Sequence, residues 1–238
     1  MKVGIVIIVY NISSEIMILQ IEAIRKFCKD DFTIEIIDNS TDIQVSTDIR
    51  YHCERLGVNY KKTFAISLNG SQSHSFAANL SYQKLKDQFD IFLYLDHDCI
   101  PVLPFSVVEI LGEEKVMAGI GQHEVNTFMW PGCVAWRNDK VDNELIDFSP
   151  CHELRQDTGS GLRKVIEKYG KENCIFFDEA YHQNPDFVDN RYGYYSMING
   201  GVFCHCVNGS NWAASDRHEE RINSFANIIR EKINANVE

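Results

Sequence analysis

The sequence has 238 residues with a formal net charge of −11, and 45% of its residues are hydrophobic. A chain of this length can bury a large core, and α/β units of this size are often one domain. The acidic charge argues against a nucleic-acid or anionic-membrane surface. No apolar run approaches the length of a membrane span, so we expect no transmembrane segment.

The chain opens with a nearly pure β-branched run, VGIVIIVY at residues 3–10. This run predicts a central parallel strand, and it lacks the basic region and cleavage site of a signal peptide. The eight cysteines form no CxxC pair, which favours reduced thiols over a zinc or disulfide framework. We therefore expect a cytoplasmic protein, which can also lie at the inner face of the membrane through a partner or a small surface patch.

The first hundred residues alternate between predicted strands and helices. Hydrophobic residues recur at helical spacing over about 14–28, and a second strand, TIEII, ends in a polar DNS at 38–40. A third strand is predicted within 57–65, and a helix over about 74–87 leads into a strand at 91–95. This order is typical of βαβ units, so the sequence predicts an α/β fold with a Rossmann-type, mostly parallel sheet flanked by helices.

The strand at 91–95 leads directly into two aspartates, in the sequence LYLDHDCIP. Open α/β sheets bind ligands beyond the carboxyl ends of their strands. In an extended segment Asp96 and Asp98 would point the same way, towards a divalent cation or a ribose, and His97 would point away. The alternative is that both aspartates are strand-end or turn residues, since Pro101 limits the strand.

The second half of the chain is less regular. Short strands are predicted at 116–121 and 202–207, and an aromatic segment with a turn at its middle is predicted at 128–137. The sequence DTGSGL opens a helix near 157–161, and the chain ends in an amphipathic helix over about 216–235.

Several of these segments resemble the GT-A glycosyltransferases, in particular the family-2-like inverting enzymes with a DXD motif. The matching sequences are VIIVYN, IIDNS, FAANLSYQ and LYLDHDCIP, followed later by DTGSGL and FCHCVNGSNW. The resemblance implies one GT-A-like domain over 1–238, with a nucleotide-sugar-binding half at about 1–101 and an acceptor and catalytic half at about 102–238. It also implies an inverting hexosyltransferase that takes a UDP- or GDP-sugar, uses Mn²⁺ or Mg²⁺, and acts on a glycan or lipid-linked hydroxyl acceptor in polysaccharide or glycoconjugate synthesis.

The same resemblance implies roles for individual residues. The donor nucleotide would be bound by Tyr10, Asn11, Asp38 and Asp96, the metal ion by Asp98, Asp96 and His205, and the acceptor by Trp130 and Trp212. Asp157 would be the general base that an inverting transfer requires. Hard cations favour carboxylate and phosphate oxygens, and one imidazole is compatible with Mn²⁺.

Some of these residues also have structural alternatives. Asp157 can instead cap the helix that follows it. His205 can be a buried structural histidine, and strand alternation places it on the face opposite Cys204 and Cys206, which excludes zinc capture by this tripeptide alone. Trp136, close to Trp130 in sequence, can belong to the core.

Two rival functions come from different classes. A sugar-nucleotide nucleotidyltransferase would need a glycine-rich loop with Arg or Lys after the first strand. Residues 11–14 contain neither glycine nor a basic residue. A non-catalytic nucleotide-sugar-binding module would keep the fold without the chemistry. Asn39 and Gln156 leave this second rival open, because they stand where the resembling enzymes often carry a further acidic residue.

Overall fold

The computed structural model describes residues 1–63, 70–154, 156–184, 193–207, 209 and 217–235. One sheet contains β1 (Val3–Val9), β2 (Phe32–Asp38), β3 (Asn59–Lys62), β4 (Ile91–Asp96), β6 (Met117–Gln122), β7 (Phe128–Arg137) and β8 (Cys174–Phe176). A second sheet contains β5 (Cys99–Pro101), β9 (Glu179–His182), β10 (Tyr195–Ile198) and β11 (Phe203–Cys206). The α-helices are α1 (Ser14–Phe27), α2 (Ile43–Leu56), α3 (Gly70–Leu85), α4 (Val107–Leu111), α5 (Arg163–Tyr169) and α6 (His218–Ala235).

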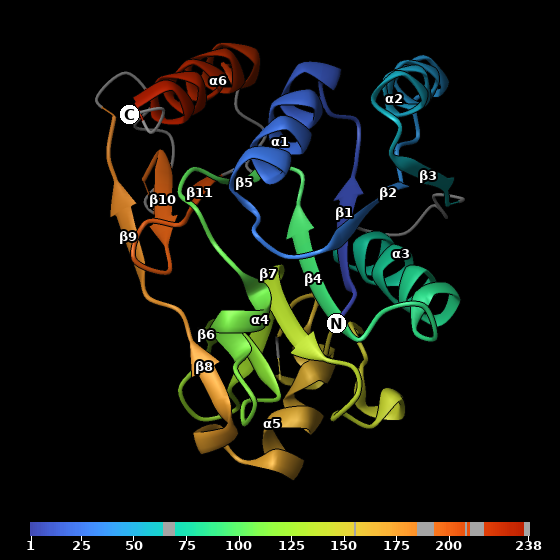
Figure 1. Ribbon diagram of the computed structural model, residues 1–238, viewed down its shortest axis with the longest axis vertical. Coiled ribbons are helices and arrows are strands. Elements are labelled where there is room, and N and C mark those ends of the chain that lie inside the picture. Colours follow the sequence, from blue (N-terminus) through green and yellow to red (C-terminus); the bar gives the residue numbers. More distant parts are fainter. Residues whose placement is uncertain (64–69, 155, 185–192, 208, 210–216, 236–238) are drawn as a thin grey trace.

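The large sheet has the strand order β3-β2-β1-β4-β7-β6-β8, as the central arrows of Figure 1 show. Strands β3, β2, β1 and β4 run parallel, β7 is antiparallel to both β4 and β6, and β8 is parallel to β6. The smaller sheet has the order β5-β11-β10-β9 and is antiparallel throughout. The predicted α/β fold with a mostly parallel central sheet is confirmed.

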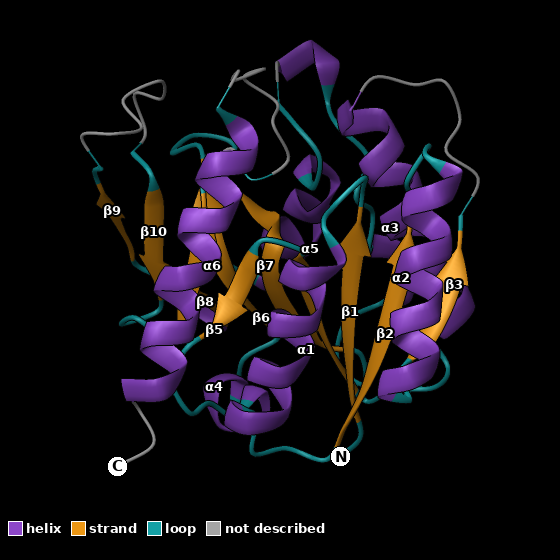
Figure 2. Cartoon of the chain, turned by 90° about the horizontal axis from the view of Figure 1, so that it is seen from above, coloured by secondary structure: helices purple, strands orange, loops and turns teal. Residues whose placement is uncertain are grey.

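Helices cover both faces of the large sheet, with α1, α2 and α6 in front of it and α3 and α5 behind it in Figure 2. Alternate residues of the central strands therefore supply two cores. Ile5 and Leu93 belong to the core beneath α1 and α6, whereas Val6 and Tyr94 belong to the core beneath α3 and α5. Burial on both faces explains the uninterrupted apolar runs of β1 and β4.

Helix α2 was not foreseen from the sequence, although both of its ends carry clear signals. The Asp42 side chain accepts hydrogen bonds from the backbone N–H groups of Gln44 and Val45, and Gly57 ends the helix with a φ of 62°. Between these caps only Ser46, Ile49 and Cys53 are buried. Val45 and Leu56 are partly buried, and with Ile49 and Cys53 they recur at helical spacing, so this helix was predictable from the sequence.

The turn expected in the middle of the aromatic segment is wrong, because β7 runs without a break from Phe128 to Arg137. Pro131 lies beyond Cys133, where pairing with β4 ends, and beside the register shift between β6 and β7. The missing N–H of Pro131 therefore costs the sheet no regular ladder bond. Gly132 leaves room for the Trp130 ring, since a Cβ there would lie 2.5 Å from Trp130 Cε2.

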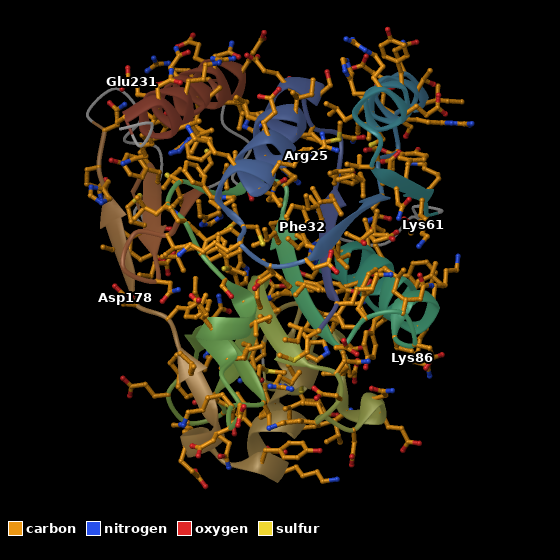
Figure 3. All side chains as sticks on the ribbon, in the orientation of Figure 1. Arg25, Phe32, Lys61, Lys86, Asp178 and Glu231 are labelled. Carbon is orange, nitrogen blue, oxygen red and sulfur yellow. The ribbon has the colours of Figure 1, made fainter. Side chains whose placement is uncertain are left out.

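Lys61, Lys86 and Glu231 lie at the periphery of the molecule, as their labels in Figure 3 show, whereas other charged residues, such as Arg221, are fully buried. Of the helices in the described parts of the chain, none combines the length and the apolar character that crossing a bilayer requires.

Candidate active site

The carboxyl ends of β1, β2 and β4 meet at one edge of the large sheet. In the register of these parallel strands, Ile8 lies opposite Asp96 and Val9 lies opposite Asp38. After β1 the sheet continues through β2 and β3 on one side of β1, and the next strand, β4, lies on the other side of β1. The strand order therefore reverses between β1 and β4, and open α/β sheets bind ligands at such a switch point. Tyr10 follows β1 at this point and is 40% exposed.

The segment Asp96–Cys99 is a strand end followed by a turn, and the extended alternation expected from the sequence stops at Asp96. Gln20 from α1 holds this turn, because its Nε2 donates hydrogen bonds of 2.8 Å to the carbonyls of Asp96 and Cys99. The backbone N–H of Cys206 in β11 donates to the Asp98 carbonyl at 2.9 Å. His97, which stands between the two aspartates in the sequence, is buried.

Asp96 pairs with a histidine that the sequence did not single out. Asp96 Oδ1 lies 2.9 Å from Nε2 of His74, in the first turns of α3. Burial opposes both charges, yet the pairing holds the pKa of Asp96 below its ordinary value and the pKa of His74 above it. The charges of Asp98 and Asp157 also raise the pKa of His74, so three carboxylates favour the protonated form of this imidazole.

Asp98 is buried, and one of its oxygens is unsatisfied. Oδ1 has no hydrogen-bond partner among the described residues, and the nearest cationic candidate is His205 Nε2 at 3.9 Å. Burial raises the pKa of Asp98 to about 6, with His205 opposing the rise and Asp96 adding to it. The other side of the carboxylate packs against Gly209, where a Cβ would come within 2.8 Å of Asp98 Cγ.

His205 lies in β11 with the alternation that the sequence predicts. Cys204 and Cys206 are fully buried, whereas His205 is only half-buried and its ring centroid lies 4.7 Å from that of Trp130. Trp130 therefore reaches the same group of side chains as Asp98. Trp136 is fully buried in the core on the α3 side, and Trp212 lies outside the described residues.

Asp157 is exposed and is held beside the start of α3. Its carboxylate accepts hydrogen bonds from the backbone N–H of Thr158 at 2.6 Å and from the hydroxyl of Ser71. The expected helix cap is wrong, because α5 follows Leu162 and the 3₁₀ turn before it follows Gly159. The bond to Ser71, three residues before His74, brings Asp157 to the same end of the sheet as Asp96.

Asp38 has a different environment from Asp96. It is fully buried and accepts hydrogen bonds of 2.8 Å from the Ser40 N–H and the Tyr60 hydroxyl, with Lys62 Nζ at 3.2 Å. By strand alternation it faces α1 and α2, whereas Asp96 continues the Tyr94 row that faces α3. Asp38 thus fixes the end of β2, and we do not include it in the site proposed below.

Asn11 also has structural partners. Its side chain accepts hydrogen bonds from the backbone N–H groups of Thr41 and Asp42 and donates to the Thr41 hydroxyl at 3.1 Å. The residue adopts a φ of 44°, a conformation that asparagine tolerates well. Asn11 therefore ties the chain after β1 to the chain after β2 and shapes the wall of the switch point.

A divalent cation fits part of this site. Within the described part of the chain, no group of three or more His, Cys, Asp or Glu side chains is arranged to hold a metal ion. Asp98 and His205 nevertheless supply an unsatisfied carboxylate oxygen and an imidazole nitrogen side by side. Hard cations at phosphate-binding sites take one or two protein ligands and complete their shell with phosphate oxygens and water, which suits these two residues.

No protein-family model and no curated protein sequence matches the chain. Among solved structures, the chain is similar to the mannosyltransferase PcManGT from Pyrobaculum calidifontis in complex with GDP-Man and Mn²⁺, with 11% identity over 73% of this chain and a TM-score of 0.49. It is also similar to TarS of S. aureus, with 15% identity over 71% of this chain and a TM-score of 0.45. A third structure, the glycosyltransferase GlyE of Streptococcus pneumoniae in its apo form, has 18% identity over 71% of this chain and a TM-score of 0.44.

The first and the third of these structures are named as a mannosyltransferase and a glycosyltransferase. The chain spans 54%, 33% and 44% of their respective lengths. Similarities this distant do not extend to activity or substrate.

Proposed function

We propose that this protein transfers a sugar from a nucleotide-sugar donor to a hydroxyl acceptor with the help of a divalent cation. The observation that carries the proposal is the unsatisfied, buried Oδ1 of Asp98 beside His205, at the switch point of a mostly parallel sheet. A buried carboxylate oxygen without a partner is costly, and a cation bound there would satisfy it.

The donor would lie beyond the ends of β1 and β4. Asp98 and His205 would hold Mn²⁺ or Mg²⁺, which as a Lewis acid stabilises the charge of a departing nucleoside diphosphate. Tyr10 offers an exposed ring on which a nucleobase can stack. Asp96, oriented by its pairing with His74, would face the ribose or the cation.

Asp157 would accept the proton of the acceptor hydroxyl. Its carboxylate is exposed, and the bonds from Ser71 and Thr158 fix its direction without burying it. An oriented carboxylate within reach of the acceptor is what an inverting transfer requires of its base. Trp130 would offer an aromatic surface to the acceptor sugar next to His205.

A turnover assay tests this function. The protein, Mn²⁺ and a panel of UDP- and GDP-sugars are combined with glycan and lipid-linked acceptors, and release of the nucleoside diphosphate is measured. We expect one donor to be turned over, and Asp157→Asn to lower kcat by about 10²- to 10⁴-fold while nucleotide binding is kept. Asp87→Asn, a change at an exposed aspartate outside the site, is the matched control.

Two results would contradict the proposal. Unchanged turnover in Asp157→Asn would remove Asp157 from the chemistry. Tight nucleotide binding without turnover of any donor would instead identify a nucleotide-sugar-binding module.

A further inference from the structure

The side chain of His205 is connected to a second polar group on the side away from Asp98. Ser196 lies directly opposite His205 in the antiparallel pair of β10 and β11, so both side chains project from the same face. The Ser196 hydroxyl lies 3.4 Å from His205 Nδ1 and 2.7 Å from Oε1 of Glu179 in β9. These contacts form a chain from Glu179 through Ser196 and His205 towards Asp98.

We propose that Glu179 and Ser196 are positioning residues that fix His205 in the tautomer protonated at Nδ1, so that Nε2 presents its lone pair to a divalent cation beside Asp98. This inference rests on the proposed function for its cation, but the hydrogen-bond chain itself is independent of it.

The direction of each hydrogen bond between Glu179, Ser196 and His205 follows from the donors available. The Ser196 hydroxyl donates to Oε1 of Glu179, and this bond uses the single hydroxyl proton of Ser196. The hydroxyl oxygen then accepts from His205, which requires the proton of the imidazole at Nδ1. Ser196 is fully buried, so no solvent molecule competes for its hydroxyl.

The other side of the ring agrees with this assignment. Nε2 and Asp98 Oδ1 are 3.9 Å apart, which is too long for a hydrogen bond, and Oδ1 has no other partner among the described residues. Two atoms with lone pairs that face each other in this way favour a cation between them. Metal-binding histidines commonly donate their second ring N–H to an outer group, which fixes the ring and its tautomer.

The tautomer is measured first, in metal-free protein, from the ¹⁵N chemical shifts of the His205 ring at mildly alkaline pH. We expect a protonated Nδ1 and an unprotonated Nε2 in the parent protein. In Ser196→Ala we expect a mixture of tautomers or the opposite one. Glu179→Gln keeps the serine but weakens its acceptor, and we expect it to shift the mixture in the same direction.

Tyr181→Phe is the matched control, because the Tyr181 hydroxyl donates to Oε2 of Glu179 at 2.7 Å on an exposed side chain and is not part of the chain to His205. We expect it to keep the parent tautomer. If Ser196→Ala does not fold, Glu179→Gln decides the result. A parent His205 protonated at Nε2, or a tautomer unchanged in both variants, would overturn the proposal.

Metal affinity is measured second, as Mn²⁺ binding followed by electron paramagnetic resonance in the presence of UDP or GDP. We expect Ser196→Ala to weaken Mn²⁺ binding by about 10- to 100-fold and Tyr181→Phe to leave it unchanged. Equal affinity in the parent and in Ser196→Ala would overturn the positioning role. Absence of Mn²⁺ binding by the parent itself would instead overturn the proposed function, and the tautomer result would still stand or fall separately.

Discussion

At the scale of single residues, Asp96 and Asp98 differ sharply although they are two positions apart. Asp96 pairs with His74, which favours its charged form, whereas Asp98 is buried with an unsatisfied oxygen, which disfavours its charge. Charge on Asp96 therefore stabilises the fold, and charge on Asp98 destabilises the fold when no cation is bound.

We expect Asp98→Asn to stabilise the metal-free protein. The pKa of Asp98 is raised from 3.8 to about 6 in the folded state, so stability falls as pH rises between these values and stays low above them. Removing this charge should raise the free energy of unfolding by on the order of 2 kcal/mol at about pH 8, and by almost nothing near pH 4. Urea denaturation at both pH values measures the difference.

Asp96→Asn is the matched control for that experiment, and it should have the opposite sign because the pKa of Asp96 is lowered by its pairing with His74. A destabilised Asp98→Asn at about pH 8 would mean that this carboxylate is an ordinary structural residue.

Gly209 gives a second prediction at this scale. A Cβ at this position would lie 2.8 Å from Asp98 Cγ, so Gly209→Ala should displace the carboxylate from His205. We expect metal-dependent nucleotide binding to weaken by about 10- to 100-fold, as for other small displacements of a binding group. Gly70→Ala is the control, because a Cβ there meets nothing within 4 Å. Equal binding by the two variants would show that the contact with Gly209 does not position Asp98.

At the scale of elements, the site depends on α1 although no residue of that helix was expected in it. Gln20 is fully buried, and its Nε2 bridges the carbonyls that open and close the turn after β4. The helix therefore fixes the geometry of both aspartates.

We expect Gln20→Leu to lower the free energy of unfolding by about 1–3 kcal/mol, because it leaves one buried and one partly buried carbonyl group without their donor. Urea denaturation measures the loss. Gln88→Leu is the control, since Gln88 donates to the Lys84 carbonyl on an exposed surface, and we expect a change within about 0.5 kcal/mol. A Gln20→Leu protein as stable as the parent would contradict the role of Gln20 in holding the turn.

The elements also show what the sequence could predict. The apolar runs of β1 and β4 and the stripes of α1 and α6 predict correct elements, because burial imposes a pattern on consecutive residues. Helix α2 carries the same kind of pattern, with Val45, Ile49 and Cys53 at helical spacing, and was predictable although we did not predict it. The continuous strand β7 was not predictable, because a register shift accommodates Pro131 within it.

The residues of the candidate site also fall into those that the sequence could indicate and those that it could not. Asp96, Asp98 and His205 could be found from strand ends and from a family resemblance. His74, Gln20, Ser196 and Glu179 could not, because their partners lie 9 to 79 positions away and only the tertiary structure brings them together. Asp38 faces the opposite side of the sheet from Asp96, which depends on the register of β2 against β1.

At the scale of the whole molecule, the switch point joins the two sheets. The turn after β4 leads from the large sheet into β5 of the small sheet, and β11 of the small sheet carries His205 to Asp98. A ligand held by both residues therefore connects the two sheets.

We expect Mn²⁺ together with the correct nucleoside diphosphate to stabilise the folded protein. A ligand at 100 times its dissociation constant adds about 2.7 kcal/mol to the free energy of unfolding. Thermal denaturation should show a higher Tm with both ligands than with either alone, and EDTA should reverse the shift. An equal Tm with both ligands, with Mn²⁺ alone, with the nucleotide alone and with EDTA added would contradict a site shared by cation and nucleotide.

The most direct test of the central claim is a calorimetric titration of UDP and of GDP into the protein, with Mn²⁺ and then with EDTA, in the parent and in Asp98→Asn. The site described above predicts that one nucleotide binds only when Mn²⁺ is present and that this binding is lost in the folded variant. If neither nucleotide binds, or if one binds equally well with EDTA or in Asp98→Asn, then the two aspartates after β4 do not form a cation-assisted nucleotide site.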